Sequence, residues 1–360
     1  MKSVSIYTKD LNFDPSSYYR IVQYTSKLKN CKIFYHPQLS KEQYLKYMPI
    51  SRQNILVKVY LQVLIMMKMF IALIKDLITK VDVVLISRRI INRCFPIVFK
   101  IILIKIKKNG AKIYWDFDDH ILESKETSKG SFDFFCKISD KIVVTHEFLK
   151  ELVLEEARNK VVLLPTTDGD IYIKYNESIY SDRIKSVKNE IRLLWVGTSV
   201  NLVYLTPLIT VLDKFASNFD KKIMLNIVCN EAVDVEINNI QINNIKWTRE
   251  VAISTMLYSH IGLMPLIDSN FAKGKGGFKL VQYLSAALPI IGSDVGFNKE
   301  VCDDTVGKLV DDIYDYEHLC ESLNYVINNW EVLSRNALAK WNKDFSYNNN
   351  FLFWEECILR

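Results

Sequence analysis

The sequence predicts an α/β fold built from two doubly wound parallel-sheet domains. Short apolar runs typical of strands alternate with helical patterns along the chain, as in proteins whose parallel sheets carry helices on both faces. Several runs, such as Val81–Ile86, are continuously apolar, which indicates central strands covered on both sides. A length of 360 residues is long for one compact domain and comfortable for two.

The first half contains the strand signals of the first domain. They are Val4–Tyr7, Cys31–Tyr35, Val81–Ile86, Ala111–Trp115, Lys141–Val144 and Val161–Leu164. Ligands of such sheets bind outside the carboxyl ends of the strands. The loops Asp14–Arg20, Ser87–Arg89 and Asp116–His120 are therefore where we expect a site in this domain.

The segment Gln53–Lys80 is a long apolar helical pattern interrupted by Lys58, Lys68 and Lys75. It is either an amphipathic helix whose basic face lies on a membrane or a core helix of the α/β domain. Apolar runs such as Val59–Met67 are well under the ~20 residues that span a bilayer, so no segment is expected to cross one. Because the N-terminus runs directly into a strand pattern, we expect no signal peptide.

Charge and cysteine content limit the partners and the compartment. Residues 1–180 carry a net charge of +10, and residues 181–360 carry −4. The basic half suits an anionic partner, such as a lipid-linked phosphate or the inner face of a membrane. Without an arginine-rich tract or an aromatic–basic motif, nucleic acid is not expected. Seven scattered cysteines have no C-x-x-C pair and no metal-binding spacing, which favours reduced thiols in the cytoplasm.

The second half begins after a polar segment, Pro165–Asn189, that we interpret as a hinge. The strand pattern restarts at Ile191–Val196, and Gly197-Thr198-Ser199 forms a turn before the next helix. The later strand signals are Ile223–Val228, Ile245–Trp247, Ile261–Met264, Ile290–Gly292 and Val306–Val310.

The stretch Lys273–Val295, K-G-K-G-G-F-K-L-V-Q-Y-L-S-A-A-L-P-I-I-G-S-D-V, carries the clearest functional signal. Its glycines free the loop backbone, so N–H groups at the start of the helix can converge on an anion. Lys273, Lys275 and Lys279 place cations around the same point, which predicts a diphosphate site with Gln282 in reach of a sugar hydroxyl. A solvated turn would show the same spacing, and neither common nucleotide fingerprint matches.

The run K-L-V-Q-Y-L-S-A-A-L-P-I-I-G-S-D-V-G-F-N-K-E-V resembles the donor-site helix of family 4 (group 1) glycosyltransferases, which have the GT-B fold. L-L-W-V-G-T-S-V-N-L-V-Y-L resembles the start of their donor domain, and K-I-Y-W-D-F-D-D-H-I is similar to an acceptor-domain segment. The resemblance implies two Rossmann-like domains facing across a cleft. These are an acceptor domain over residues 1–165, a linker over 166–190, a donor domain over 191–345, and a C-terminal helix over 346–360 that crosses back to the first domain.

The resemblance also implies roles for individual residues. The catalytic residues would be Asp118, Asp119 and Lys279. The donor-binding residues would be Gly197, Thr198, Ser199, Lys273, Lys275, Gly276, Gly277, Phe278, Lys279, Leu280 and Gln282. The acceptor-binding residues would be Ser16, Ser17, Arg20, Arg88 and Arg89. The glutamate pair of the family would fall at Gly274 and Gln282, and neither residue can be an anionic base.

The resemblance implies an enzyme that transfers a sugar, with retention, from a nucleoside-diphosphate sugar to a hydroxyl of a saccharide or lipid-linked acceptor. A bacterial polysaccharide or glycoconjugate pathway would be its setting, and no metal or other cofactor is expected. Alternatively, the D-F-D-D cluster could hold a divalent cation, as in GT-A enzymes. Two rival hypotheses are a nucleotide- or lipid-phosphate-binding module without transfer activity and a membrane-surface scaffold built on Gln53–Lys80.

Overall fold

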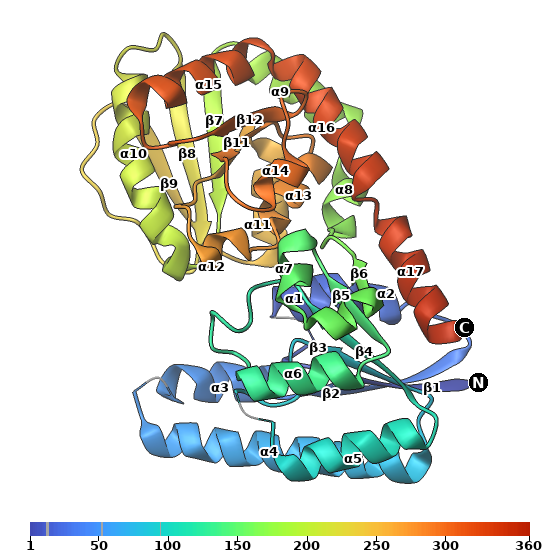
Figure 1. The fold of residues 1–360 in the computed structure, drawn as a ribbon. Helices are drawn as coiled ribbons and strands as arrows, with labels where there is room; N and C mark the ends of the chain where they lie inside the picture. Colours follow the sequence, from blue (N-terminus) through green and yellow to red (C-terminus); the bar gives the residue numbers. More distant parts are fainter. Residues whose placement is uncertain (12–13, 52, 94) are drawn as a thin grey trace. The chain divides into compact units, whose positions relative to one another are not determined.

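The computed structural model describes residues 1–11, 14–51, 53–93 and 95–360. It divides the chain into two compact units: unit 1 is Met1–Thr166 with Asn348–Arg360, and unit 2 is Thr167–Tyr347. Over the described ranges each unit contains one six-stranded parallel sheet with helices packed against it (Figure 1). The predicted α/β class with two parallel sheets is confirmed. Of the seven cysteines, Cys94 lies outside the described residues.

The sheet of unit 1 has the strand order β2-β1-β3-β4-β5-β6. Its strands are β1 (Lys2–Thr8), β2 (Cys31–Pro37), β3 (Val83–Ser87), β4 (Lys112–Phe117), β5 (Lys141–Val144) and β6 (Val161–Leu163). Val4 of β1 is in register with Ile33 on one side and with Val83 on the other. Every residue of β3 is buried, because helices cover both faces of the sheet. The chain reverses its winding direction between β1 and β3.

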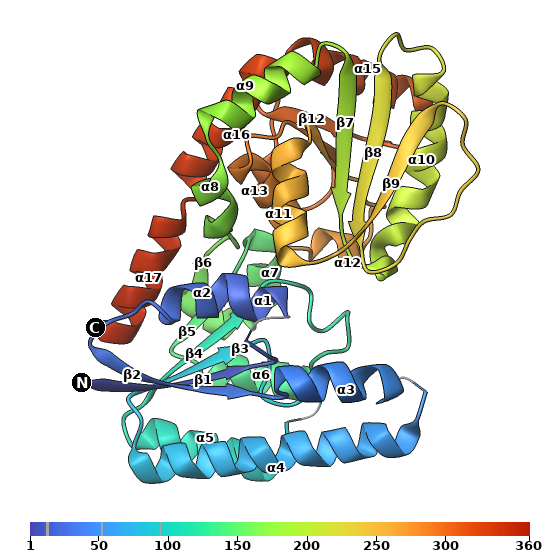
Figure 2. The same cartoon turned by 180° about the vertical axis from the view of Figure 1, so that it is seen from behind.

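The helices of unit 1 carry most of its core. The α-helices are α1 (Pro15–Ser17), α2 (Gln23–Thr25), α3 (Lys41–Ser51), α4 (Ile55–Thr79), α5 (Ile97–Lys108), α6 (Lys129–Ile138), α7 (Glu147–Leu152) and α17 (Tyr347–Leu359). A π-helical segment (Tyr18–Val22) and a 3-10 helix (Glu155–Lys160) complete them. Figures 1 and 2 show α4 and α5 side by side on one face of the sheet, with α1 and α2 on the other. On α17, Trp354 is buried and the Cys357 carbonyl accepts a hydrogen bond from the Tyr114 hydroxyl at 2.9 Å.

Helix α4 corrects one expectation from the sequence. Its 25 residues run without a break, since the lysines at positions 58, 68 and 75 do not interrupt a helix. The helix has the length and composition of a membrane span, with a mean hydropathy of 2.0 over its most apolar 18-residue window. Only 22% of that window is buried inside the structure. The apolar helix is therefore longer than the runs recognised in the sequence, and the expectation that no segment crosses a membrane stays a prediction.

The sheet of unit 2 has the strand order β12-β11-β10-β7-β8-β9. Its strands are β7 (Glu190–Val196), β8 (Lys222–Cys229), β9 (Ile240–Lys246), β10 (Ile261–Met264), β11 (Ile290–Ser293) and β12 (Gly307–Val310). The chain winds outward from β7 to β9, returns to β10, and then winds in the opposite direction. The neighbours β7 and β10 therefore form the point at which the strand order reverses.

Helices cover both faces of the second sheet. They are α8 (Gly169–Lys174), α9 (Glu177–Ser186), α10 (Leu202–Ala216), α11 (Arg249–Tyr258), α12 (Asn270–Lys273), α13 (Phe278–Ser285), α14 (Asn298–Val301), α15 (Tyr316–Asn328) and α16 (Trp330–Asp344), with a 3-10 turn at Ser199–Asn201. The cores on the two faces are separate clusters, one including α10 and α15, the other α11 and α13. The segment 166–190, interpreted from the sequence as a hinge, is mostly the helices α8 and α9, and almost all of it belongs to unit 2.

Candidate functional site

The candidate site of unit 2 lies at the carboxyl ends of β7 and β10. Ligands of open α/β sheets bind where the strand order reverses, because the two outgoing loops diverge there and leave room. The loop after β7 is the turn Gly197-Thr198-Ser199. The loop after β10 leads through α12 to the glycine-rich segment that begins α13.

Two glycines of these loops are required by the backbone and by close packing. A Cβ atom at Gly197 would overlap the indole ring of Trp195, so the turn can pass over this ring only without a side chain. Gly277 precedes α13 with a φ of +55°, in the left-handed region that favours glycine, and a Cβ there would lie 2.7 Å from the ring of Phe297. The local conformation of the site therefore depends on these glycines.

The predicted lysines divide into two groups. Lys275 donates a hydrogen bond from Nζ to Oδ1 of Asn201 at 3.0 Å, and Lys279 Nζ lies 5.0 Å from the ring centroid of Trp195. The first contact joins the loop before α13 to the 3-10 turn after β7, across a sequence separation of 74 residues, and the second joins α13 to the end of β7. Lys273 instead forms an ion pair with the exposed Asp268 at 3.1 Å. The structure thus brings Lys275 and Lys279 to the turn after β7.

Two main-chain N–H groups of this turn have hydrogen-bond partners within unit 2. The N–H of Gly197 donates to the carbonyl of Val228 at 3.0 Å and extends the ladder between β7 and β8. The N–H of Ser199 donates to Oδ1 of Asn230 at 2.9 Å. The donor-binding role that the resemblance implies for Gly197 and Ser199 therefore does not rest on these two N–H groups, because neighbouring residues of β8 and the loop after it already accept their hydrogen bonds.

Gln282 lies on α13 but is turned toward α8. Its Nε2 donates to Oδ2 of Asp168 at 2.8 Å, and its side chain is largely buried. The same carboxylate caps α8 by accepting hydrogen bonds from the N–H groups of Asp170 at 2.9 Å and Ile171 at 3.3 Å. Burial raises the pKa of Asp168 to about 6. A glutamate at position 282 would place a second carboxylate against Asp168, and the two negative charges would repel each other. This repulsion is a physical reason for glutamine at this position.

Asp168 is a residue that sequence reasoning missed. It stands inside the polar segment that was interpreted as a hinge, and its partner Gln282 is 114 residues away. A signal was present, since an aspartate before a short helical run is a preferred N-cap. Capping alone does not indicate the second contact, which needs the three-dimensional structure.

The predicted acceptor residues of unit 1 meet at the carboxyl ends of β1, β3 and β4. Arg88 Nε donates to Oδ1 of Asp118 at 2.8 Å, and its Nη2 donates to the hydroxyl of Ser16 at 2.7 Å. Nη2 also contacts Asp119. Ser16 in turn donates to Oδ2 of Asp118 at 2.8 Å. The side chain of Asp119 is 40% exposed and that of Asp118 only 11%, so Asp119 is the more accessible carboxylate.

The other three predicted acceptor residues make internal contacts. Arg20 forms a buried bidentate pair with Asp116, with Nε to both carboxylate oxygens at 2.9 Å, and also donates to the Leu164 carbonyl at 2.9 Å. Ser17 donates through its N–H and hydroxyl to Asp14, the N-cap of α1. Arg89 pairs with Glu126. The structure therefore places these residues in the framework around Arg88 and Asp118.

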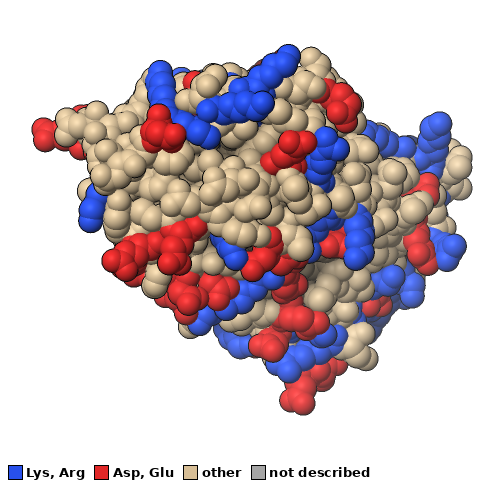
Figure 3. All heavy atoms as spheres, turned by 90° about the horizontal axis from the view of Figure 1, so that it is seen from above, with Lys and Arg blue, Asp and Glu red and all other residues tan. Residues whose placement is uncertain are grey.

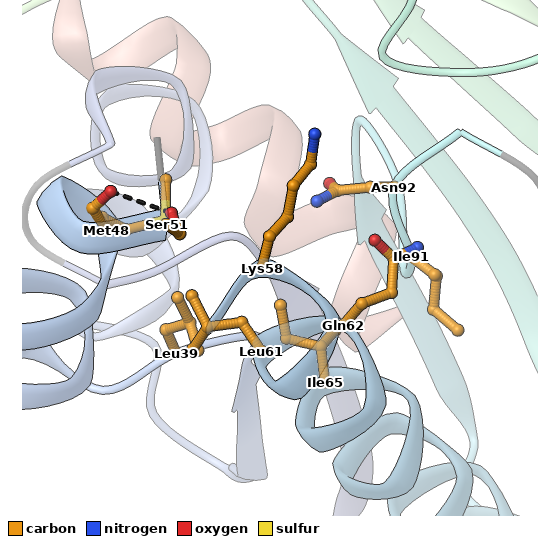
Figure 4. Close-up of a pocket in the computed structure, with 9 residues that line it drawn as sticks. All are labelled: Leu39, Met48, Ser51, Lys58, Leu61, Gln62, Ile65, Ile91 and Asn92. Carbon is orange, nitrogen blue, oxygen red and sulfur yellow. Dashed lines mark hydrogen bonds between the residues drawn. The ribbon is translucent and has the colours of Figure 1, made fainter. Parts of the chain in front are cut away.

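A cavity of about 280 Å³ lies elsewhere in unit 1, beside α3 and α4 (Figure 4). It is lined by apolar side chains such as Leu39, Met48 and Leu61, with the ammonium-bearing chain of Lys58 and the amide of Asn92 at one side. This cavity could not be predicted from the sequence, because its walls come from four separate segments. For metals, no group of three or more His, Cys, Asp or Glu side chains suited to hold an ion occurs within the described part of the chain.

Comparisons with known proteins identify the fold. No protein-family model and no curated protein matches the sequence. Among solved structures, a glycosyltransferase from Rickettsia africae ESF-5 covers 100% of this chain and 99% of its own, with 13% identity and a TM-score of 0.62. Anabaena HepE in complex with UDP covers 99% of both chains, with 10% identity and a TM-score of 0.64.

A third similar structure is the sucrose-phosphate synthase of Thermosynechococcus elongatus, which covers 99% of this chain and 98% of its own at 9% identity, with a TM-score of 0.61. All three are similar over nearly the whole of both chains. At identities this low the likeness defines the fold, and the fold is the one shared by GT-B glycosyltransferases.

Proposed function

We propose that this protein is a glycosyltransferase that moves a sugar from a nucleoside-diphosphate sugar to a hydroxyl of a saccharide or lipid-linked acceptor. The observation that carries the proposal is the meeting of Lys275 and Lys279 with the turn after β7, at the reversal of strand order. Similar structures support it: Anabaena HepE was solved in complex with UDP and with UDP-glucose. Family 4 membership and a polysaccharide pathway in the cytoplasm belong to the same proposal.

In the proposed reaction, the bond between the anomeric carbon and the diphosphate oxygen breaks, and the acceptor oxygen bonds to that carbon with retention. The proton of the acceptor hydroxyl passes to the leaving diphosphate. Negative charge develops on the leaving diphosphate. Lys275 and Lys279 would stabilise this charge, and the N–H groups at the start of α13 would add their partial positive charge. Phe278 and Leu280 belong to the same turn of the helix. No metal is assigned a role.

We assign acceptor binding to the polar group around Arg88 in unit 1. Asp119 would accept the hydrogen bond of an acceptor hydroxyl, because its carboxylate is the accessible one. Asp118 would act as a positioning residue, since it holds both the guanidinium of Arg88 and the hydroxyl of Ser16. The apolar side chains that line part of the cavity beside α4 suit a lipid part of the acceptor. Peripheral association with a membrane would bring such an acceptor to the enzyme.

A binding module without transfer activity is the second candidate function. The contact of Gln282 with Asp168 favours it, because the residue that aligns with a family glutamate is buried in a structural hydrogen bond. Gly274 likewise offers no carboxylate. The two functions differ in turnover, not in nucleotide affinity.

The test is a binding screen of UDP, GDP, TDP and ADP sugars by calorimetry, followed by measurement of donor hydrolysis and of transfer to saccharide acceptors. We expect one nucleotide to bind with micromolar affinity and its sugar to be released or transferred. Tight binding of a nucleoside diphosphate with no turnover of any donor would favour the binding module. Absence of binding to every nucleotide would refute the glycosyltransferase and the nucleotide-binding module.

A further inference from the structure

The outer surface of α4 and α5 is unusually apolar. More than half of the large hydrophobic side chains that are exposed in the described residues belong to these two helices. Met67 is 59% exposed and Ile71 63% exposed on α4, and Ile101 is 47% exposed on α5. Soluble proteins rarely leave many large apolar side chains exposed together on one surface, and such patches mark interaction sites. We call the outward side of these two helices the α4–α5 face.

Helix α4 is apolar on opposite sides. Its inner side packs into the core of unit 1 through Leu61, Ile65 and Met69, which follow one another at helical spacing. Val63 and Phe70 lie on the outward side. A surface helix normally carries polar residues there, so α4 requires a second apolar environment in addition to its own core.

The charges of the α4–α5 face have one sign. Helix α5 contains four lysines and no acidic residue, and the acidic residue of α4, Asp76, points inward. Asp76 accepts hydrogen bonds from the hydroxyls of Ser5 and Tyr7, both at 2.6 Å. Lys105 and Lys108 are exposed near the end of α5. On the face drawn in Figure 3, by contrast, acidic and basic side chains are interspersed.

The internal contacts of α4 show that it lies along the surface of unit 1. Asp76 is hydrogen-bonded to β1, and Lys68 Nζ donates to the Gln38 carbonyl at 3.1 Å. Phe70 stacks on Phe99 of α5 with ring centroids 5.8 Å apart. A helix that crossed a bilayer would lose these contacts and expose a buried carboxyl to hydrocarbon, which is costly. Its outward side is instead suited to the interface between lipid headgroups and acyl chains.

The N-terminal end of α4 adds a hollow to this surface. Lys58 and Gln62 line both the 280 Å³ cavity and a shallower depression next to Ile55 and Val63. A cationic side chain at a cavity with mixed polar and apolar walls suits an amphiphile with an anionic head and a hydrocarbon tail.

We propose that the α4–α5 face docks unit 1 on the surface of an anionic lipid bilayer, with its apolar side chains inserted among the acyl chains and its lysines against the headgroups. This proposal rests on the peripheral membrane association proposed above and specifies which face of unit 1 meets the membrane and the charge of the lipids that it binds. Docking requires neither nucleotide nor sugar transfer, so it can fail or hold independently of the enzymatic function.

The experiment is co-sedimentation of the full chain with vesicles of phosphatidylcholine alone and of phosphatidylcholine with about one third phosphatidylserine. We expect binding to the anionic vesicles, weak binding to the neutral ones, and release by high salt. Neutralisation of Lys105 and Lys108 to Gln should weaken binding about fivefold per lysine. The triple change Met67→Ser, Ile71→Ser, Ile101→Ser should weaken it more than tenfold.

Matched controls lie away from this face. Ile173→Ser, Val332→Ser and Leu352→Ser remove three similarly exposed apolar side chains, and Lys185→Gln with Lys188→Gln removes two exposed charges. These controls should leave vesicle binding within about twofold of the unchanged protein. All substituted side chains are at the surface, and circular dichroism and thermal melting verify that each variant is folded.

Four results would overturn the proposal. The first is no preference for anionic vesicles, and the second is an equal loss of binding in the control variants. The other two concern what else could cover the face. If the protein is a dimer that the triple change splits while no vesicle binding occurs, a second copy covers the face. If only detergent, and not salt, releases the protein from vesicles, α4 inserts across the bilayer instead.

Discussion

Replacing Asp168 by Asn should flatten the pH dependence of stability between about pH 4 and pH 6. The native pKa of Asp168 is about 6, raised by burial, whereas an unfolded chain gives about 3.9. Between these values the native state holds a proton that the unfolded state has released. The free energy of unfolding therefore falls as pH rises through this window, by roughly 3 kcal/mol for a shift of about two units.

Asparagine can keep the local structure. Its oxygen caps α8 as aspartate does, and the amide of Gln282 can turn so that its oxygen accepts from the new NH₂ group. The variant should thus differ from the unchanged protein mainly in lacking the titration. We expect the difference in unfolding free energy, variant minus unchanged, to grow by about 3 kcal/mol from pH 4 to pH 7.

The assay is urea unfolding followed by tryptophan fluorescence at pH 4, 5, 6 and 7. Trp341 is a local reporter, since its Nε1 donates to the hydroxyl of Thr167 at 3.1 Å, next to Asp168. The contributions of the other carboxyl groups to the pH dependence cancel in the difference between the two proteins. Asp234→Asn, at an exposed position, serves as the control variant. Parallel stability curves for Asp168→Asn and the unchanged protein would refute the reasoning, as would a difference that shrinks with rising pH.

Two further predictions concern buried polar contacts. Gln282→Glu places a carboxylate beside Asp168 and should destabilise unit 2 by about 2–4 kcal/mol at pH 8. Adding Asp168→Asn should restore most of the lost unfolding free energy. A double-mutant cycle that shows no coupling between the two positions would contradict this. Arg20→Ala leaves the buried carboxylate of Asp116 without its arginine and should lower the free energy of chemical unfolding by about 3–5 kcal/mol. Arg20→Lys should retain only part of this stability, because lysine cannot make the bidentate pair. If Arg20→Ala lowered the unfolding free energy by less than about 1 kcal/mol, water would be solvating the carboxylate of Asp116 in place of the arginine, and the reasoning would be contradicted.

Much of the fold is predictable because its strands are buried on both faces. Val83–Ser87 and Glu190–Val196 are nearly or wholly buried, so burial forces continuous apolar runs that are easy to recognise. The helices α8 and α9 are not predictable in this way. Their sequence is polar, and they are held by caps at Asp168 and Asn176 and by a few buried residues such as Tyr180.

The candidate site is only partly predictable, for a different reason. Glycines before a helix and nearby lysines are local patterns, so the segment around Lys275 could be recognised. Hydrogen-bond partners from distant segments could not: Ser199 is satisfied by Asn230, and Gln282 by Asp168. The exposure of α4 was also undecidable from composition, because a core helix and a membrane-docking helix have the same apolar content.

The most direct test of the donor site is the affinity for a nucleoside diphosphate after the double change Lys275→Ala, Lys279→Ala. Each charge-assisted contact with a phosphate contributes about 1.5–3 kcal/mol, so calorimetry should show at least a hundredfold weaker binding of the nucleotide that the unchanged protein prefers. The control, Lys188→Ala with Lys222→Ala, removes the same charge near the amino ends of β7 and β8 and should bind as the unchanged protein does. Equal affinity in the double variant and the unchanged protein would contradict the proposed site.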